Sequence, residues 1–192
     1  MVDVKTYQCF PTLIHEFHGE QTTESHTNML NVIELESKAD DLHQRLAFKD
    51  FIKRVLECNK YVLDADGYAY EKIEITNMWG TTLSDGDSHW PHTHSNNTLS
   101  GVYYLQASKN TSPIQFFDPR PQASVWQPRI KKPNCHNSSR LQFESVVGVG
   151  FIFPSWLMHW VPPTKAERVS ISWNVIVRGD YGEPNTFQNA HI

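Results

Sequence analysis

The sequence predicts an α+β fold, or a β-sandwich or barrel with helices packed on one face. The N-terminal third has apolar residues at helical spacing, whereas the chain from Tyr68 onward consists of short β-type runs. Gly, Pro, Asn, Asp and Ser separate these runs, as is usual for turns between strands. Helices first and antiparallel strands afterwards are typical of this fold class.

Two helices are expected in the N-terminal third. The first is short and is indicated by four apolar residues, Met29, Leu30, Ile33 and Leu35. The second is indicated by residues that share one helical stripe, namely Leu42, Leu46, Ile52, Val55, Leu56 and Asn59. Asp40 or Asp41 is the expected cap of this second helix, and the turn residues 64–67 end it.

Six strands are expected in the rest of the chain: Tyr68–Thr76, Leu99–Ala107, Ile114–Phe117, Leu141–Val147, Val149–Phe153 and Arg168–Val177. The last one alternates strictly, with Val169, Ile171 and Trp173 on one face and Arg168, Ser170 and Asn174 on the other. For an isolated strand the polar face would meet water. In a curved sheet, the polar face could instead line an interior while the helices cover the apolar face.

Length and composition limit the classes of protein. A chain of 192 residues suits one domain, with a helical part at 1–67, a β-core at 68–178 and a tail at 179–192. The net charge of −4 argues against a nucleic-acid-coating protein. No apolar run approaches the length of a membrane helix, and no secretory signal is visible. Three scattered cysteines, Cys9, Cys58 and Cys135, indicate reduced thiols, so we expect a cytoplasmic protein.

Histidines form the densest chemical feature of the chain. In an extended segment His92 and His94 point to the same side, so both rings can reach one metal ion. His159 follows a very apolar run and precedes Pro162. A hairpin centred after Pro163 would make His159 and Arg168 cross-strand partners and would place Ser170 beside them. A neutral-imidazole metal site beside a cation and a hydroxyl suits a metal with a carboxylate-bearing co-substrate.

At these residues the sequence resembles a known family. The segments that carry the resemblance are His92–His94, Leu99–Leu105, Phe117–Arg120, Phe153–Trp156 with His159, and Arg168–Ser170 with Asn174. Together they resemble the 2-oxoglutarate/Fe(II)-dependent oxygenases, relatives of the prolyl hydroxylases. The resemblance runs from about Trp79 to Asn174. It implies a double-stranded β-helix, or jelly roll, with Fe(II) at one mouth and 2-oxoglutarate as co-substrate.

The resemblance also implies roles for individual residues. His92 and His159 correspond to the two histidine ligands of the family, and Arg168 with Ser170 corresponds to the anchor for the far carboxylate of 2-oxoglutarate. Tyr103, Tyr104 and Asn174 are candidates for hydrogen bonds to co-substrate or ligands. His94 departs from the broader pattern, because the superfamily has Asp or Glu there. Either His94 completes a three-histidine face or water or an anion does; Asp87 and Asp118 are weaker candidates.

The implied reaction is oxidative decarboxylation of 2-oxoglutarate with dioxygen, coupled to hydroxylation or a related oxidation of an unidentified substrate. Two alternatives remain open at this point. One is a non-catalytic jelly-roll module with a structural metal, and the other is a three-histidine dioxygenase that uses no 2-oxoglutarate. A zinc hydrolase is disfavoured, because HTHSNN lacks the DH of an HxHxDH pattern.

A basic, proline-rich segment is the remaining feature. Residues 119–140 contain no acid and five bases, Arg120, Arg129, Lys131, Lys132 and Arg140. A loop of this length is usually functional or variable. It predicts a lid or recognition loop for an acidic or phosphorylated substrate, although a solvated insertion fits equally well. The oligomeric state, a homodimer included, is left open by the sequence.

Overall fold

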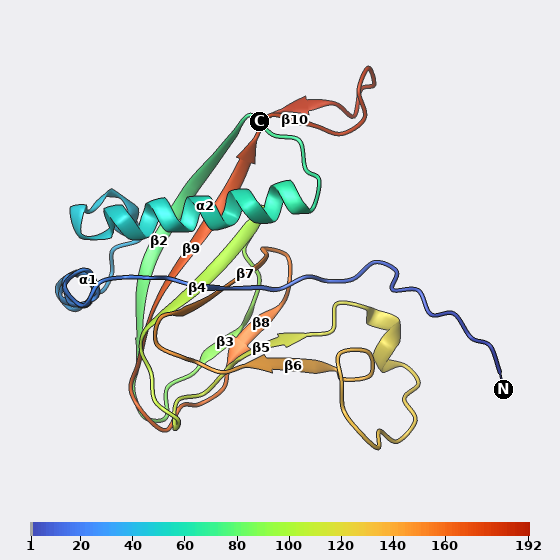
Figure 1. The fold of residues 1–192 in the computed structure, drawn as a ribbon, viewed down its shortest axis with the longest axis horizontal. Helices are drawn as coiled ribbons and strands as arrows, with labels where there is room; N and C mark the ends of the chain where they lie inside the picture. Colours follow the sequence, from blue (N-terminus) through green and yellow to red (C-terminus); the bar gives the residue numbers. More distant parts are fainter. Residues whose placement is uncertain (1) are drawn as a thin grey trace.

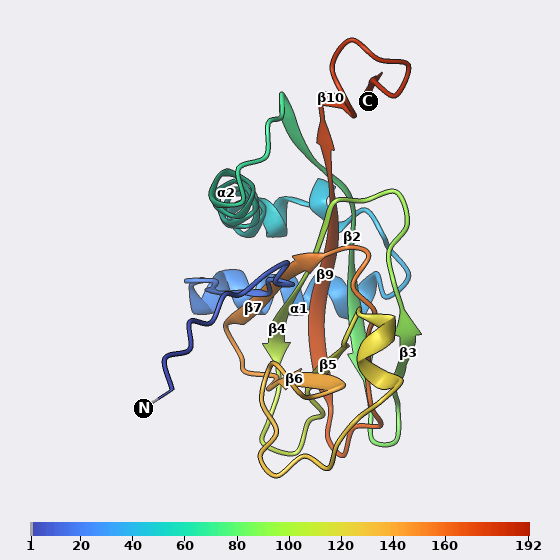
Figure 2. The ribbon, with the colours of Figure 1, turned by 90° about the vertical axis from the view of Figure 1, so that its right-hand side faces the viewer.

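The structure, a computed structural model, describes residues 2–192. Two helices, α1 (Thr23–Leu35) and α2 (Lys49–Ala65), cover one face of a five-stranded antiparallel sheet. A second antiparallel sheet of four strands packs against the opposite face (Figures 1 and 2). The predicted α+β class is therefore confirmed, and the helices are restricted to one side of the β-core.

The five-stranded sheet has the order β1-β7-β4-β9-β2. Its strands are β1 (His15–His18), β7 (Val149–Pro154), β4 (Leu99–Gln106), β9 (Arg168–Arg178) and β2 (Lys72–Leu83). The four-stranded sheet has the order β3-β8-β5-β6. Its strands are β3 (His89–His92), β8 (His159–Val161), β5 (Ile114–Phe117) and β6 (Arg140–Phe143).

Strand β9 separates the helical core from the space between the sheets. Its apolar residues, among them Ile171 and Trp173, pack with α1 and α2 in the main core. Gly101 of β4 makes room for the Trp173 ring, because a Cβ at this position would lie 2.1 Å from a ring carbon. Burying the apolar face under the helices turns the polar face inward, so the curved-sheet interpretation of this strand is the one that the structure shows.

The boundaries of the second helix differ from those expected. Two short 3-10 helices, Leu42–Gln44 and Leu46–Phe48, precede α2. The α-helix itself begins only at Lys49. Asp40 and Asp41 therefore do not cap α2. The Asp41 carboxylate instead accepts hydrogen bonds from Arg45, and the Asp40 carbonyl accepts one from the Met78 amide. The first helix begins at Thr23, capped by the Thr22 hydroxyl.

All six expected strands form, and two of them shift. The first begins four residues later, at Lys72, and continues to Leu83, whereas the run expected over Leu141–Val147 ends at Phe143. The short strands β1, β3 and β8 were not expected. The tail forms a hairpin of β10 (Asp180–Tyr181) and β11 (Ala190–His191), and a 3-10 turn spans Pro121–Ser124.

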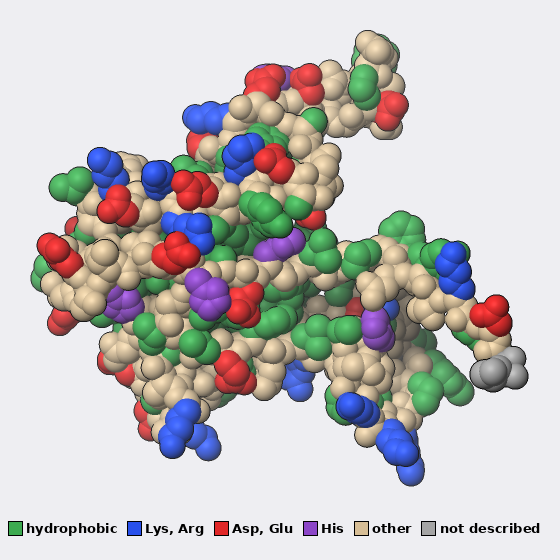
Figure 3. Space-filling model, in the orientation of Figure 1, with side chains coloured by type: hydrophobic (Ala, Val, Ile, Leu, Met, Phe, Trp, Pro, Cys, Tyr) green, Lys and Arg blue, Asp and Glu red, His purple; other side chains and the backbone are tan. Residues whose placement is uncertain are grey.

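The C-terminal hairpin, the loop between β5 and β6 and the N-terminal segment stand out from the body of the molecule (Figures 1 and 3). Cys9, Cys58 and Cys135 are free thiols. Among the described residues, no helix combines the length and apolarity that crossing a membrane requires.

Candidate metal centre

Strand β3 brings two histidines to one face through a β-bulge. His89 pairs with Val161 and His92 pairs with His159, so three steps along β3 correspond to two along β8. The extra residue puts His89 and His92 on the same side, which a regular strand would not do. Their ring centroids lie 4.5 Å apart. His92 therefore faces the space between the sheets, with His89 beside it.

His159 begins strand β8 rather than ending the apolar strand before it. The hairpin predicted between His159 and Arg168 is wrong, because β8 and β9 belong to different sheets. β8 pairs with β3 and β5, whereas Arg168 pairs with Leu83 of β2. The two residues still line one pocket, because their sheets face each other across it. His159 and Arg168 are therefore close together as predicted, but they lie on facing sheets and not on paired strands of one hairpin.

His94 lies just beyond β3 and is held by the turn that precedes β8. Its amide donates to the Ser155 carbonyl at 2.9 Å. The Ser155 hydroxyl is hydrogen-bonded to that of Ser100, which donates to the amide oxygen of Asn174. The Asn174 amide nitrogen in turn donates to Asn77. This buried chain fixes the turn that positions His94.

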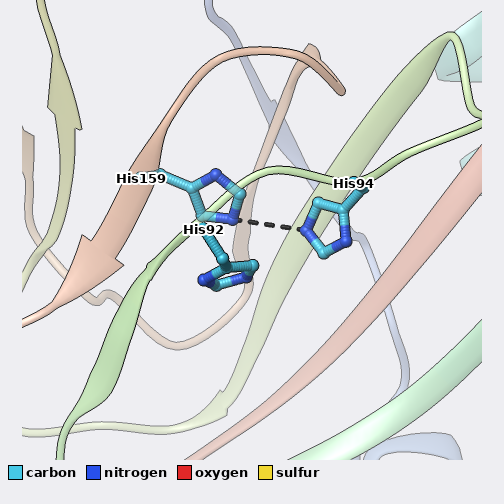
Figure 4. Close-up of side chains that lie close together, drawn as sticks. All are labelled: His92, His94 and His159. Atoms are coloured by element: carbon cyan, nitrogen blue, oxygen red, sulfur yellow. Dashed lines mark hydrogen bonds between the residues drawn. The ribbon is translucent and has the colours of Figure 1, made fainter.

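The three imidazoles point toward one another (Figure 4). One ring nitrogen from each of His92, His94 and His159 lies within 4.8 Å of the others. The Nε2 atoms of His94 and His159 are 3.4 Å apart, a separation that suits two ligands of one ion. Among residues 2–192, these three histidines form the one group of His, Cys, Asp or Glu side chains whose ligand atoms lie close enough together to hold a metal ion.

Backbone carbonyls fix the orientation of two of the rings. The Nδ1 atoms of His92 and His159 lie 2.6 Å and 2.9 Å from the carbonyl oxygens of Trp90 and Leu157. A carbonyl only accepts, so Nδ1 carries the proton and donates it. Each Nε2 then presents a lone pair toward the centre of the cluster, as a metal ligand must.

Burial keeps His94 and His159 neutral. Loss of hydration lowers the pKa of His159 to about 3, and its ring packs against Phe116 and Phe153. Burial also lowers the pKa of His94 to about 4, with smaller contributions from the nearby His92 and His89. Neutral imidazole is the form that binds a metal, so the site is ready to bind one at neutral pH.

The same pKa values predict acid sensitivity of the metal-free protein. The unfolded chain binds a proton at His159 near pH 6.5, and the folded chain does so only near pH 3. Between these values the unfolded state holds more protons, so stability falls as pH falls. From pH 6.5 to 5, His159 alone should cost about 2 kcal/mol, or about 4–8 °C in Tm. Calorimetry of His159→Phe should show a weaker pH dependence; an equal one would contradict the assignment.

Arg168 lies in the same pocket with a guanidinium that lacks a counter-charge. The residue is 2 % exposed, and its Nε donates to the Ser145 hydroxyl at 3.3 Å. Within the described chain, no carboxylate lies within ion-pair distance of it. A buried cation without a partner is costly, so this arrangement fits a site for an anion.

The other residues expected at the site fall into two groups. Ser170 lines the pocket next to Arg168, and the ring of Tyr104 lies 4.9 Å from the Arg168 guanidinium carbon. Tyr104 itself is not among the residues that line the pocket, and its buried hydroxyl has no hydrogen-bond partner among the described residues. Tyr103 instead points to the helical core, against Phe51. Asn174 lies in a neighbouring cleft that shares His94 with the pocket.

Neither alternative carboxylate reaches the histidines. Asp87 accepts from the Ser84 amide within a turn, and Asp118 pairs with Arg120 at 2.8 Å. His89 also lines the pocket, although the sequence did not single it out as a site residue. It lies three residues before His92, a spacing that puts two side chains on one face only where a bulge intervenes. The HWPH segment, with its proline inside a short strand, was the available signal.

Comparisons with known proteins agree with this geometry. A family model described as "Putative 2OG-Fe(II) oxygenase" matches residues 77–174, a segment that contains all three clustered histidines and Arg168. A search of curated protein sequences finds no match.

Several solved structures share the fold. A prolyl-4-hydroxylase from Pseudomonas putida superposes with a TM-score of 0.62 at 14% identity, over 90% of this chain and 88% of that one. HygX from Streptomyces hygroscopicus, with nickel and 2-oxoglutarate bound, gives 0.59 at 10% identity over 86% and 82%. The collagen prolyl hydroxylase of Paramecium bursaria Chlorella virus-1 gives 0.55 at 10% identity over 91% and 98%. The double-stranded β-helix expected from the sequence is thereby confirmed.

Proposed function

The chain belongs to the "Putative 2OG-Fe(II) oxygenase" family, and from this we propose that it is an Fe(II)- and 2-oxoglutarate-dependent dioxygenase. The reaction would convert 2-oxoglutarate and dioxygen to succinate and carbon dioxide, and would place the second oxygen atom on a substrate, by hydroxylation or a related oxidation. The observation that carries the proposal is that Arg168, buried and without a carboxylate partner among the described residues, lies in the same pocket as three converging histidines.

The donor set fits Fe(II). Three imidazoles that converge on one point are donors that Fe(II) accepts, and they would leave the ion accessible to a keto acid and dioxygen. His92, His94 and His159 would hold the ion, which supplies the redox chemistry with dioxygen. The carbonyl partners of His92 and His159 keep their rings aimed at it without further rearrangement.

The anion site fits the distal carboxylate of 2-oxoglutarate. The guanidinium of Arg168 would bind that carboxylate through charge-assisted hydrogen bonds, with Ser170 as a further donor. The Tyr104 hydroxyl would donate to the same group and so gain the partner that it lacks. Val102, Ile114 and Phe153 line the pocket and exclude water from it.

Anaerobic titration tests the proposal. The metal-free protein is titrated with Fe(II) and then with 2-oxoglutarate, and the weak visible charge-transfer band of the chelate is recorded. We expect the band to appear only when both are present. Its absence from correctly folded protein would favour a structural metal site, which has no use for a buried anion anchor. Fe(II)-dependent oxidation without 2-oxoglutarate would favour the three-histidine dioxygenase.

His94→Asp tests the third ligand. An aspartate ligand is negatively charged, so it lowers the net charge of the metal-loaded site by one. We therefore expect Fe(II) to bind to His94→Asp at least as tightly as to the wild type, and we expect turnover of 2-oxoglutarate to rise. His94→Ala should weaken Fe(II) binding by more than about 100-fold, because loss of a ligand exceeds the 10-fold to 100-fold effect of losing a residue that only orients one. Both variants are compared by metal titration and succinate release. Unchanged affinity and activity in both would remove His94 from the ligand set.

A further inference from the structure

The loop between β5 and β6 lies at the metal-binding end of the four-stranded sheet. These strands are antiparallel, so the ends of β3 and β5 lie beside the starts of β8 and β6. His92 ends β3, His159 begins β8, and residues 118–139 connect the end of β5 to the start of β6. Phe116 and His159 are paired directly. The loop therefore begins two residues after Phe116, the strand partner of the proposed metal ligand His159.

Positive charge gathers on this loop without counter-charge. Figure 3 shows Lys and Arg side chains together on the lobe that the loop forms. Arg129, Lys131, Lys132 and Arg140 are exposed, and within residues 2–192 no carboxylate pairs with them. Arg120 is different, because Asp118 holds it. The chain as a whole is acidic, so these four free cations are a local feature and not a consequence of composition.

The lobe also has the shape of a binding surface for an extended ligand. One hollow, of about 610 Å³, is lined by Trp126, Arg129 and Lys132. A second, of about 300 Å³, is lined by Arg140 and Gln142, and Ile130 borders both. Trp126 is 90 % exposed, so its ring is available to contact a ligand at this surface.

The second hollow runs along an open sheet edge. β6 pairs only with β5 among the described strands, so its outer backbone groups are unpaired within the sheet. An extended peptide can add to such an edge through main-chain hydrogen bonds. β6 is two strands from β8, about 10 Å across the sheet. Three or four residues of extended chain span that distance at roughly 3.3 Å each.

We propose that the surface formed by residues 118–142 docks an acidic, extended polypeptide segment of the substrate and presents a neighbouring residue to the metal centre. This rests on the proposed function and adds the class of substrate to it. Carboxylates would pair with Arg129, Lys131, Lys132 and Arg140, and the chain would lie over Trp126. A small acid docked here would not reach across two strands to the histidines.

A nucleic acid fits the surface less well. Single-strand binding sites stack successive bases on several aromatic side chains, whereas Trp126 is the one large aromatic that lines these hollows. An oligonucleotide is therefore the comparison ligand in the test.

Fluorescence anisotropy with labelled probes tests the docking surface. The probes are a deca-glutamate peptide, a Gly-Ser decapeptide and a ten-nucleotide oligothymidylate. The loop variant carries Arg129→Glu, Lys131→Glu and Lys132→Glu. The matched control carries Lys38→Glu, Lys49→Glu and Lys53→Glu, which change the net charge equally at exposed lysines in or near the helical layer. None of these six side chains forms an ion pair among the described residues.

We expect the deca-glutamate peptide to bind the wild type at least tenfold more tightly than either other probe, and added salt to weaken it. The loop variant should lose this binding at least tenfold, and the control variant should keep it within about twofold. Equal loss in both variants, or no preference over the Gly-Ser peptide, would overturn the proposal. Tighter binding of the oligonucleotide would overturn it in favour of a nucleic-acid surface.

The Fe(II)–2-oxoglutarate chelate band separates this proposal from the proposed reaction. We expect the loop variant to form the band as the wild type does, because the loop cations lie outside the histidine and Arg168 pocket. Loss of the band in the loop variant would mean that the substitutions disturb the metal centre, and would overturn a separate docking role. Loop-dependent peptide binding by a wild type that forms no band would refute the reaction and leave the docking surface standing.

Discussion

Replacing His159 by phenylalanine is expected to abolish tight Fe(II) binding. Even loss of a residue that only orients a ligand typically weakens metal binding 10-fold to 100-fold, so loss of a ligand should exceed about 100-fold. Phenylalanine keeps the aromatic packing against Phe116 and Phe153, so the substitution removes the donor atom without opening a cavity. Isothermal titration with Fe(II) under anaerobic conditions measures the change.

The control for this experiment is His18→Ala. His18 is an exposed histidine of β1, on an edge strand of the other sheet. Its removal should leave Fe(II) affinity unchanged. If His159→Phe bound Fe(II) with wild-type affinity while remaining folded, the three-histidine centre would have to be abandoned.

Replacing Arg168 by methionine should change two quantities in opposite directions. Affinity for 2-oxoglutarate should fall by about 100-fold, because charge-assisted hydrogen bonds to a carboxylate are lost in a buried pocket. The metal-free protein should become more stable, by a few degrees in Tm, because a buried cation with no counter-ion is replaced by an apolar chain of similar length. Fe(II) affinity in the absence of 2-oxoglutarate should be unaffected.

A lower affinity for 2-oxoglutarate together with a higher Tm distinguishes an arginine that binds an anion from one that only stabilises the fold. A residue that merely stabilised the fold, through Ser145 and the Tyr104 ring, would lower Tm when replaced. Arg168→Lys keeps the charge and loses the planar fork, so its affinity should lie between those of wild type and Arg168→Met. A lower Tm together with unchanged 2-oxoglutarate affinity would contradict the assignment.

The fold was predictable where the signal is local. The alternation of β9 identifies both of its faces, and Ile114–Phe117 forms a strand with the predicted bounds. Short strands such as β3 and β8 contain too few residues to show a period. They exist because neighbours that are distant in sequence supply their hydrogen bonds. The start of α2 was misjudged because Asp41 forms an ion pair with Arg45 instead of capping the helix.

The site was predictable from residue types and not from connectivity. His92, His94 and His159 were identified from their spacing and from the family resemblance, and the structure brings them together. The link from β8 to β9 was not predictable, because symmetry about Pro163 favours a hairpin. In the structure, Thr164 instead exchanges backbone hydrogen bonds with the turn at Gly86 and Asp87, and the chain crosses to the other sheet. A pairing rule that holds within one sheet cannot detect such a crossing.

The narrowness of the pocket has a kinetic consequence. The side chains around the three histidines and Arg168 leave about 30 Å³, whereas ligand sites are typically about 300–1,000 Å³. A five-carbon keto acid needs more room, so some of the side chains that line the pocket must move aside before it can bind. Association should then be limited by that opening, and its observed rate should reach a plateau as the 2-oxoglutarate concentration rises in stopped-flow mixing.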